Sequence, residues 1–346
     1  MAITKKLINW YLVNKRDLPW RATNNPYFIW LSEIILQQTQ VAQGLPYYKA
    51  FTSKFPTVFD LANAEESQVL KLWQGLGYYS RARNLHASAK YIVNEFNGVF
   101  PDTYNEIIKL KGVGDYTASA IASICFNETT AVVDGNVYRV LSRIYGISTP
   151  INTGKGFKEF KALAQELIDT KQPATFNQAI MEFGARQCKP KSPDCSICPF
   201  NTSCVALQKN KIEQLPVKLK ALKVKKKNFN FMVILSADQK TILEKREGKG
   251  IWQNLYQFPL IETKQPVNIL EIEAELECFS ILKNRNFNVS IYNETPIVHK
   301  LSHQHLYTTF WILTIDGNLS EGISTKKITD FPVPILISNF IERFNF

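Results

Sequence analysis

Four cysteines lie close together in the chain, with the spacing C-x6-C-x2-C-x5-C: Cys188, Cys195, Cys198 and Cys204. Four thiolates that converge in a short loop need a thiophilic ion to offset their charge, and zinc and a [4Fe–4S] cluster are the candidates. Structural zinc sites more often contain two C-x2-C pairs, whereas this segment has one. The spacing therefore favours an iron–sulfur loop over residues 188–204, with zinc as the alternative.

A second segment, residues 104–126, has the sequence YNEIIKLKGVGDYTASAIASICF and predicts two helices joined by a hairpin. The hairpin consists of Lys111, Gly112, Val113 and Gly114. Glycines allow backbone N–H groups to approach a phosphate oxygen without a Cβ in the way, and the lysine adds positive charge. The second helix is expected to start near Asp115 as its N-cap. The pattern indicates non-specific binding to a DNA backbone, and an ordinary helix–turn–helix connection is the alternative.

Two carboxylates could carry acid and electrostatic chemistry. Glu33 lies in the helical run FIWLSEIILQQTQV and shares a face with Ile29 and Trp30. A carboxyl pressed against apolar groups holds its proton more readily, as a general acid must. Asp134 follows the apolar run AVV at a helix start, where it could simply be an N-cap. The phosphates of DNA would repel a carboxylate, so a carboxylate near DNA needs another reason to be there. Stabilising a positive charge that develops during a reaction would be such a reason.

The elements that must position these residues differ between the two ends of the chain. With 346 residues, the chain is expected to form two domains. Residues 1–215 have a helical pattern, for example Val137, Val140, Leu141 and Ile144. Residues 229–346 contain strand-like runs such as FNFMVIL and YTTFWILTI and one helix-like run, LEIEAELECF. We therefore expect a helical domain followed by a smaller α+β domain.

The charge is distributed unevenly along the chain. The net charge of +11 is the sum of +7 for residues 1–215, +6 for residues 216–228 and −2 for residues 229–346. The segment PVKLKALKVKKKN (216–228) predicts an exposed basic linker. A basic helical half and a basic linker suit a polyanionic partner. The sequence shows neither an apolar run long enough to span a bilayer nor a signal-peptide pattern, so we expect no membrane partner and a cytoplasmic location.

These motifs together resemble the MutY family of adenine DNA glycosylases, within the endonuclease III superfamily. The matching stretches are LPWR (18–21), WLSEIILQQTQV (30–41), LWQGLGYYSRARNLH (72–86), LKGVGDYTA (110–118), VVDGNVYRVLSR (132–143), FNQAIMEFGA (176–185) and the four cysteines. The resemblance implies an all-α helix-hairpin-helix glycosylase domain with a [4Fe–4S] loop, followed by an α+β Nudix-like domain. It also implies base excision from double-stranded DNA that contains A:8-oxoguanine or A:G mispairs, by a monomer.

The resemblance implies a role for each matching residue. Glu33 would protonate the adenine at N7 and later help position water, while Asp134 would stabilise the oxocarbenium-like sugar, as in two-carboxylate glycoside hydrolysis. Tyr116 stands where relatives with lyase activity carry a catalytic lysine, so no Schiff base is expected and the enzyme would be monofunctional. The extruded adenine would lie against Leu18, Trp20, Arg21, Val41 and Glu182. Gln38 and Tyr78 would wedge into the duplex and help offset the cost of base flipping.

The C-terminal domain resembles the Nudix-like domain of the same family through GIWQNLYQFP (250–259). A working Nudix hydrolase needs a Gly-x5-Glu start, but Tyr256 stands six residues after Gly250. We therefore expect that the domain recognises the lesion and does not hydrolyse phosphates. In LSHQH (301–305), Ser302 and His303 match the family loop that reads 8-oxoguanine, and Leu301 replaces the family's aromatic residue.

Two other functions are alternatives to adenine excision. The first is a related glycosylase with lyase activity on damaged pyrimidines, which Glu33 and Tyr116 argue against. The second is a non-catalytic DNA-binding protein on the same scaffold, which the joint presence of Glu33 and Asp134 argues against.

Overall fold

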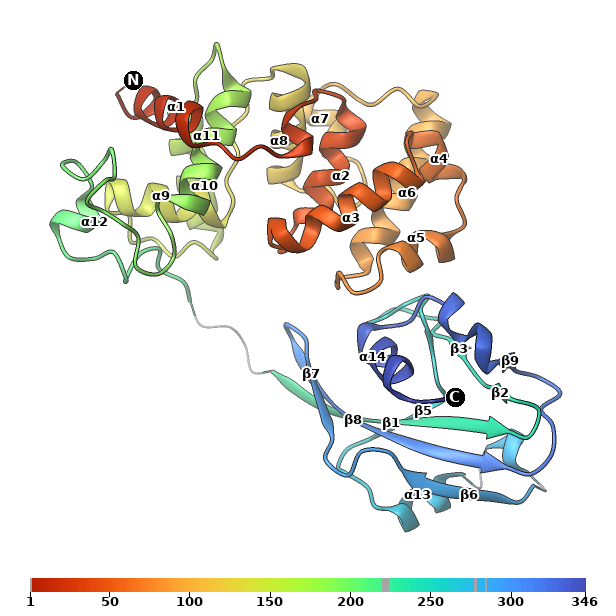
Figure 1. The fold of residues 1–346 in the computed structure, drawn as a ribbon. Coiled ribbons are helices and arrows are strands. Elements are labelled where there is room, and N and C mark those ends of the chain that lie inside the picture. Colours follow the sequence, from red (N-terminus) through yellow and green to blue (C-terminus); the bar gives the residue numbers. More distant parts are fainter. Residues whose placement is uncertain (1, 220–223, 277–278, 284) are drawn as a thin grey trace. The chain divides into compact units, whose positions relative to one another are not determined.

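The structure is a computed structural model that describes residues 2–219, 224–276, 279–283 and 285–346. The chain forms two compact units, and each is described separately (Figure 1). The first unit combines residues 2–63 with residues 84–219. The second combines residues 64–83 with the described residues from 224 onward. A segment of 20 residues from the N-terminal half thus belongs to the C-terminal unit, which the sequence did not indicate.

The first unit is helical, as the sequence predicted, and its described residues contain no strand. Its helices are α1 (Ala2–Asn14), η1 (Pro19–Arg21), α2 (Pro26–Leu36), α3 (Val41–Lys54), α4 (Val58–Asn63), most of α6 (Ser80–Phe96), α7 (Tyr104–Ile107), α8 (Asp115–Phe126), α9 (Gly135–Tyr145), α10 (Gly154–Leu167), α11 (Pro173–Arg186) and α12 (Val205–Gln208).

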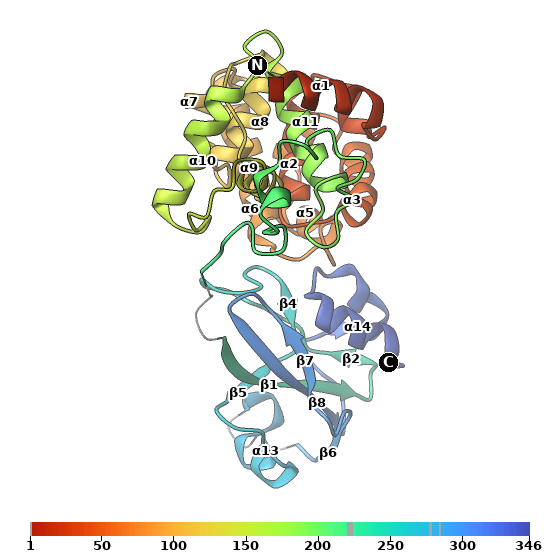
Figure 2. The ribbon, with the colours of Figure 1, turned by 90° about the vertical axis from the view of Figure 1, so that its left-hand side faces the viewer.

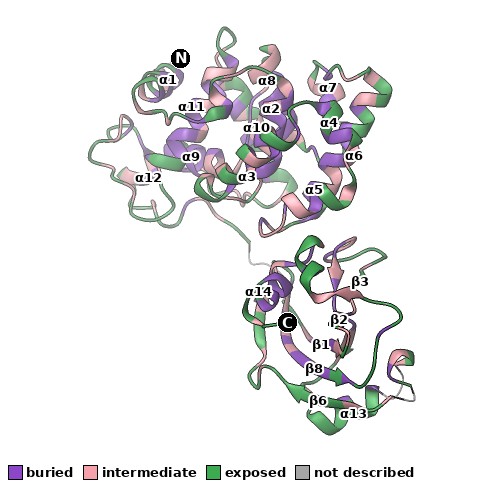
Figure 3. Ribbon diagram, turned by 45° about the vertical axis from the view of Figure 1, so that its right-hand side comes forward, coloured by how far each residue is buried: buried purple, intermediate pink, exposed green. Residues whose placement is uncertain are grey.

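Helix α11 lies at the centre of this unit and contacts α1, α8 and α9. Its Phe176 and Phe183 are buried in one core, which also holds the apolar face of α9 that the helical spacing predicted. Each fully buried large apolar side chain stabilises the fold by about 1.5–3 kcal/mol relative to exposure. Figure 3 shows the buried residues concentrated along α2, α8, α9 and α11. This packing fixes the helices that carry the candidate catalytic groups.

Helix ends in the first unit follow from local chemistry. Asn25 caps α2 through a hydrogen bond from the N–H of Tyr27, and Pro26 occupies the first helical position. Helix α9 ends at Gly146, whose φ of +72° suits glycine and where an added Cβ would meet Val205 at 2.5 Å. Helix α8 starts one residue earlier than expected, because Gly114 is the N-cap and Asp115 is the first helical residue.

The second unit is built around a five-stranded mixed sheet (Figure 2). The strand order is β5-β1-β8-β6, and β7 also pairs with β8; among the strand pairs of the described residues, only β1 and β8 are parallel. The sheet strands are β1 (Lys225–Ser236), β5 (Leu260–Thr263), β6 (Phe287–Ile291), β7 (Ile297–Lys300) and β8 (Gln304–Ile315). Two small ladders pair β2 (Lys240–Thr241) with β9 (Ile323–Ser324) and β3 (Glu244–Lys245) with β4 (Tyr256–Gln257). The helices are α5 (Glu66–Leu72), α13 (Ile269–Leu276), η2 (Ser280–Leu282), η3 (Thr325–Asp330) and α14 (Ile335–Arg343).

Helices cover both faces of the sheet. Successive side chains along a strand point to opposite faces, so each strand contributes side chains to both cores. On one face, Met232 and Trp311 pack in a core with Ile272 of α13. On the other face, Phe310 stacks on Phe340 of α14 with ring centroids 4.1 Å apart. The α+β fold expected for the C-terminal domain is thus confirmed.

Two predicted segments have different limits in the structure. Strand β1 starts at Lys225 and pairs with β8, so the last four residues of the expected linker 216–228 belong to the sheet. Residues 220–223 of that linker lie outside the described residues. The helix expected over 270–279 is α13, and residues 277–278 also lie outside the description. No helix in the described part of the chain is long and apolar enough to cross a membrane.

Candidate active site

Glu33 lies on the third turn of α2 and faces a small pocket of about 50 Å³ in the first unit. The pocket is lined by Trp20, Arg21, Ile29, Ser32, Glu33, Ile124, Gln178 and Met181. These residues come from η1, α2, α8 and α11, so four helices must pack correctly to form it. A cavity of this size holds one or two water molecules beside the carboxyl.

The pocket changes the acidity of Glu33. Burial raises the pKa of this carboxyl to about 7 and outweighs the hydrogen bond with Tyr116, which lowers it. The negative charge of Asp134 also raises the pKa of Glu33, and the positive charge of Arg21 lowers it. A carboxyl with a pKa near neutrality can hold a proton and then release it at neutral pH, which is the property of a general acid.

Tyr116 interacts electrostatically with both carboxylates. Its hydroxyl forms a hydrogen bond with Glu33 and lies 3.2 Å from the sulfur of Met181. Burial raises the pKa of Tyr116 well above its ordinary value, and the charges of Glu33 and Asp134 raise it further. The side chain is therefore a neutral hydrogen-bond donor at this site and not a nucleophile.

Asp134 is the N-cap of α9, as its sequence context allowed. Its Oδ1 accepts hydrogen bonds from the N–H groups of Asn136 at 2.9 Å and Val137 at 2.8 Å. Its Oδ2 accepts a third from the Asn136 side chain at 2.7 Å. Burial raises the pKa of Asp134 although these bonds lower it. The helix start and the three donors hold the carboxylate in one orientation, and its charge acts on Glu33.

The five residues expected around the adenine occupy different positions. Trp20 and Arg21 line the pocket of Glu33, but Leu18, Val41 and Glu182 are not among its lining residues. Leu18 is buried, and Val41 is the first residue of α3. The lining residues Gln178 and Met181 were not singled out from the sequence. On α11, Gln178 lies four residues before Glu182 and Met181 lies one residue before it. Because residues four apart share a helix face, the spacing between Gln178 and Glu182 was the signal that could have identified Gln178.

Glu182 is an internal ion-pair partner, with 1% of its surface exposed. It accepts bonds from Arg16 at 2.6 Å and from Arg21 at 2.8 Å. Burial alone would raise the pKa of Glu182, but the hydrogen bonds from Arg16 and Arg21 together outweigh burial and lower it to about 2. Glu182 therefore holds Arg21 in the pocket wall, and this contact connects α11 to η1.

We expect this ion pair to make the protein acid-sensitive. A carboxyl whose pKa falls from 4.5 to about 2 on folding stabilises the protein above pH 4.5 by about 3 kcal/mol, and this contribution is lost as the pH falls towards 2. Glu182→Gln should reduce the free energy of unfolding at pH 7 and flatten its dependence on pH between 5 and 2. Urea unfolding at several pH values measures both effects. An unchanged slope in the variant would show that Glu182 does not carry the pH dependence.

The helix-hairpin-helix motif forms as expected, with α7 and α8 flanking the turn. Gly112 has a φ of +81°, and an added Cβ would meet the side chain of Asn84 at 2.8 Å. Lys111 and Gly114 are exposed, whereas Val113 is buried beneath the turn. Only the first of the two expected wedge residues, Gln38, belongs to this unit, where it is exposed next to the end of α2. The turn thus presents Lys111 and the backbone of its two glycines to solvent.

The second unit contains a cavity of about 530 Å³. The structure brings Tyr78, Ser302 and His303 together in its lining, although the sequence separates them by more than 200 residues. Tyr78 has a φ of +47° and is 49% exposed, and the Arg81 guanidinium lies 5.6 Å from its ring. Leu301 also lines the cavity. An exposed ring and two exposed polar side chains thus share one hollow.

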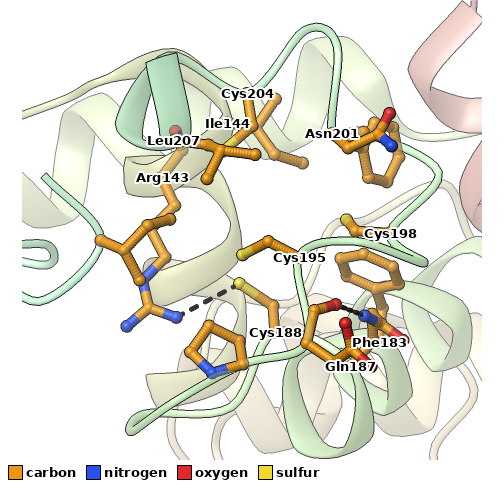
Figure 4. Close-up of a pocket in the computed structure, with 14 residues that line it drawn as sticks. Arg143, Ile144, Phe183, Gln187, Cys188, Cys195, Cys198, Asn201, Cys204 and Leu207 are labelled. Atoms are coloured by element: carbon orange, nitrogen blue, oxygen red, sulfur yellow. Dashed lines mark hydrogen bonds between the residues drawn. The ribbon is translucent and has the colours of Figure 1, made fainter. Parts of the chain in front are cut away.

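The four clustered cysteines line one small pocket, with Cys188 and Cys195 facing the same space (Figure 4). The Arg143 guanidinium lies 3.5 Å from the Cys188 sulfur, and the Cys204 thiol donates a hydrogen bond to the Arg143 carbonyl at 3.3 Å. As placed, no three His, Cys, Asp or Glu side chains within the described ranges are grouped closely enough to hold a metal ion. The four-sulfur donor set and the nearby positive charge nevertheless fit an iron–sulfur cluster.

Comparisons with known proteins define the class of protein. The family model of the HhH-GPD superfamily of base excision DNA repair proteins matches residues 31–168, and a NUDIX domain model matches residues 230–343. A solved thermostable thymine-DNA glycosylase is 30% identical, with a TM-score of 0.56, over 60% of this chain and 96% of that protein. The chain is therefore a base excision DNA repair glycosylase, a hydrolase of N-glycosyl bonds that acts on DNA.

Two curated relatives narrow the class. An adenine DNA glycosylase of Buchnera aphidicola subsp. Baizongia pistaciae is 38% identical over 363 residues, which cover 100% of this chain and 98% of the relative. The human adenine DNA glycosylase is 45% identical over 223 residues, which cover 62% of this chain and 41% of that protein. The chain belongs to the adenine DNA glycosylase family.

Proposed function

We propose that the enzyme removes adenine opposite 8-oxoguanine or guanine, with Glu33 as the general acid and Asp134 as the stabiliser of the sugar cation. The observation that carries the proposal is a carboxyl with a pKa of about 7 in a pocket, whose pKa is raised in part by the charge of a second carboxylate fixed at a helix start. Two carboxyl groups with different environments are the requirement for this type of glycoside cleavage.

The residues divide the reaction between them. The adenine is extruded from the duplex, and protonated Glu33 transfers its proton to N7, which makes the base a better leaving group. As the glycosidic bond breaks, positive charge develops on the sugar, and the fixed carboxylate of Asp134 stabilises it. Glu33, now ionised, accepts a proton from the water that attacks C1′. Tyr116 keeps the Glu33 carboxyl in place through its hydrogen bond.

The direct test uses a duplex with a single A:8-oxoguanine pair. The enzyme is expected to produce abasic sites that break only after alkali, because a neutral tyrosine at position 116 provides no amine for a Schiff base. Strand breaks without alkali would indicate a lyase, and intact DNA in both samples would indicate a DNA-binding protein without this activity. Matched duplexes with A:T and damaged pyrimidines serve as controls.

We also propose that the cavity in the second unit recognises the lesion. Ser302 and His303 present hydrogen-bonding groups at its rim, and Tyr78 presents an exposed ring suited to stacking. These features match what a base edge requires, namely hydrogen-bond partners and a flat apolar surface. The domain keeps the NUDIX fold, and the missing Gly-x5-Glu pattern supports a binding role for it.

We expect His303→Ala to reduce selectivity more than overall turnover. Removing one hydrogen bond to the lesion costs about 1 kcal/mol, or roughly five- to tenfold in preference for A:8-oxoguanine over A:G. The measurement is the ratio of single-turnover rate constants on the two duplexes. His305→Ala is the control, because His305 lies outside the cavity lining. An equal loss of rate on both duplexes would contradict a role in lesion reading.

Finally, we propose that Cys188, Cys195, Cys198 and Cys204 hold a [4Fe–4S] cluster. They share one pocket that is otherwise largely apolar, and the Arg143 guanidinium offsets part of the thiolate charge. Purified protein should absorb visible light as a brown sample and contain about four iron atoms per chain. Zinc without iron in the same analysis would identify the alternative, a structural zinc site.

A further inference from the structure

A second cavity of the first unit adjoins the pocket of Glu33. It has a volume of about 440 Å³ and is called the vestibule here; Leu12, Ala174 and Thr175 are part of its wall. Arg21, Ile124 and Gln178 line both the vestibule and the pocket of Glu33. The two cavities are therefore back to back, with these three side chains between them.

The vestibule opens at the opposite end of the helices from the DNA-binding hairpin. The hairpin precedes Asp115 at the start of α8, whereas Ile124 lies nine residues further along that helix, or about 14 Å at 1.5 Å per residue. Helix α2 packs against α8. Gln37 follows the end of α2 and donates a hydrogen bond to the Gly112 carbonyl, whereas the vestibule residue Ala22 precedes the start of α2. Glu33 thus lies between a DNA side and a vestibule side.

The sizes of the two cavities differ in a way that matters for product release. The pocket of Glu33, at about 50 Å³, is smaller than sites that hold small organic molecules, whereas the vestibule, at about 440 Å³, lies within their usual range of 300–1,000 Å³. A base freed from its sugar would therefore gain room by moving towards the vestibule. DNA bound at the hairpin would close the other direction.

The wall of the vestibule suits a neutral, flat purine. The Tyr11 ring is stacked beneath the Arg21 guanidinium at 5.5 Å, and its hydroxyl donates a hydrogen bond to the Gln178 side chain. Thr175 adds a hydroxyl group. Glu182 offsets one of the two positive charges of Arg16 and Arg21. The wall also contains Lys15 and Asp17, whose charges cancel in the sum, so the net charge around the vestibule is about +1 and a neutral base can enter.

We propose that the vestibule is the exit for the free adenine, with Gln178 as the gate between it and the pocket of Glu33. The proposal rests on the proposed function, because only a cleaved base needs an exit. It requires that the base leaves while the abasic DNA is still bound to the hairpin face. The order of release is then base first and DNA second.

The experiment follows adenine and DNA separately. An A:8-oxoguanine duplex with a radiolabelled adenine is cleaved in a single turnover, and the label that stays with the enzyme–DNA complex is measured after rapid gel filtration. Ala174→Trp narrows the vestibule from α11. Leu12→Trp narrows it independently from α1, at a position that is 56% exposed and therefore tolerant of substitution. The matched control is Val13→Trp, because Val13 is 85% exposed on the same helix and does not line the vestibule.

We expect the wild type and Val13→Trp to lose the label while they retain the DNA. The two vestibule variants should cleave the glycosidic bond at the wild-type rate but release adenine about tenfold more slowly than the wild type. In these variants the label should therefore leave the enzyme together with the DNA. Equal and rapid release of adenine from all four proteins would overturn the vestibule proposal and leave the proposed function intact. If the wild type frees no adenine at all, both proposals fail. Normal cleavage by either vestibule variant shows that it is folded.

Discussion

Glu33→Gln is expected to lower the single-turnover rate of adenine excision by about two to four orders of magnitude, the usual contribution of a general acid. Glutamine keeps the size and most hydrogen bonds of the side chain but has no proton to give. The hydrogen bond between Tyr116 and position 33 can still form, so the pocket should keep its shape. The measurement is rapid quenching of a single turnover on the A:8-oxoguanine duplex.

The pH dependence gives the same prediction a second readout. Because the pKa of Glu33 is raised to about 7, the acid form predominates below pH 7 and is lost above it. The wild-type rate should therefore fall as the pH rises through 7, and the residual rate of Glu33→Gln should lack this decline. Glu166→Gln on the exposed side of α10 is the matched control and should behave as the wild type does.

Stability should change in the opposite direction from activity. A carboxyl whose pKa rises from 4.5 to about 7 on folding destabilises the folded state above pH 7 by up to about 3 kcal/mol. Glu33→Gln removes this cost, so the variant should be more stable than the wild type at pH 8 and nearly equal to it at pH 4. A variant that is inactive and also less stable at pH 8 would contradict this account, since simple misfolding would then explain the loss.

The sequence predicted the local features well, because they depend on neighbouring residues. The capping role of Asp134, the turn at Gly112 and the apolar face of α9 all follow from spacing along a single segment. The two-domain architecture followed from the chain length and from the change from helical to strand-like patterns. The placement of Glu33 and Asp134 in one site came from the family resemblance.

The features that the sequence did not predict depend on contacts between distant segments. Glu182 was expected to line the adenine pocket, and its ion pairs with Arg16 and Arg21, more than 160 residues away, were not predicted. The assignment of residues 64–83 to the C-terminal unit is another example. There, Gln74 bonds to Ser338 and Lys71 to the carbonyl of Phe331, contacts that no local pattern encodes. Buried polar pairs of this kind are specified by the fold as a whole.

Asp134→Asn separates the two roles of this residue, as cap and as anion. Asparagine caps helices as well as aspartate does, and its side-chain oxygen can still accept the N–H bonds of Asn136 and Val137. The free energy of unfolding should therefore change by less than about 1 kcal/mol. The negative charge is lost, and with it the stabilisation of the sugar cation, so the rate of excision should fall by about two to three orders of magnitude.

Asp134→Ala provides the comparison, because it removes both the charge and the cap. It should lose activity to the same extent and also lose about 1 kcal/mol of stability. Urea unfolding and single-turnover kinetics on all three proteins measure the two effects independently. If Asp134→Asn cleaved at the wild-type rate, capping alone would account for the residue. The charge at the start of α9 would then contribute nothing to the reaction, and the cation would have to be stabilised by Glu33 after its proton has left.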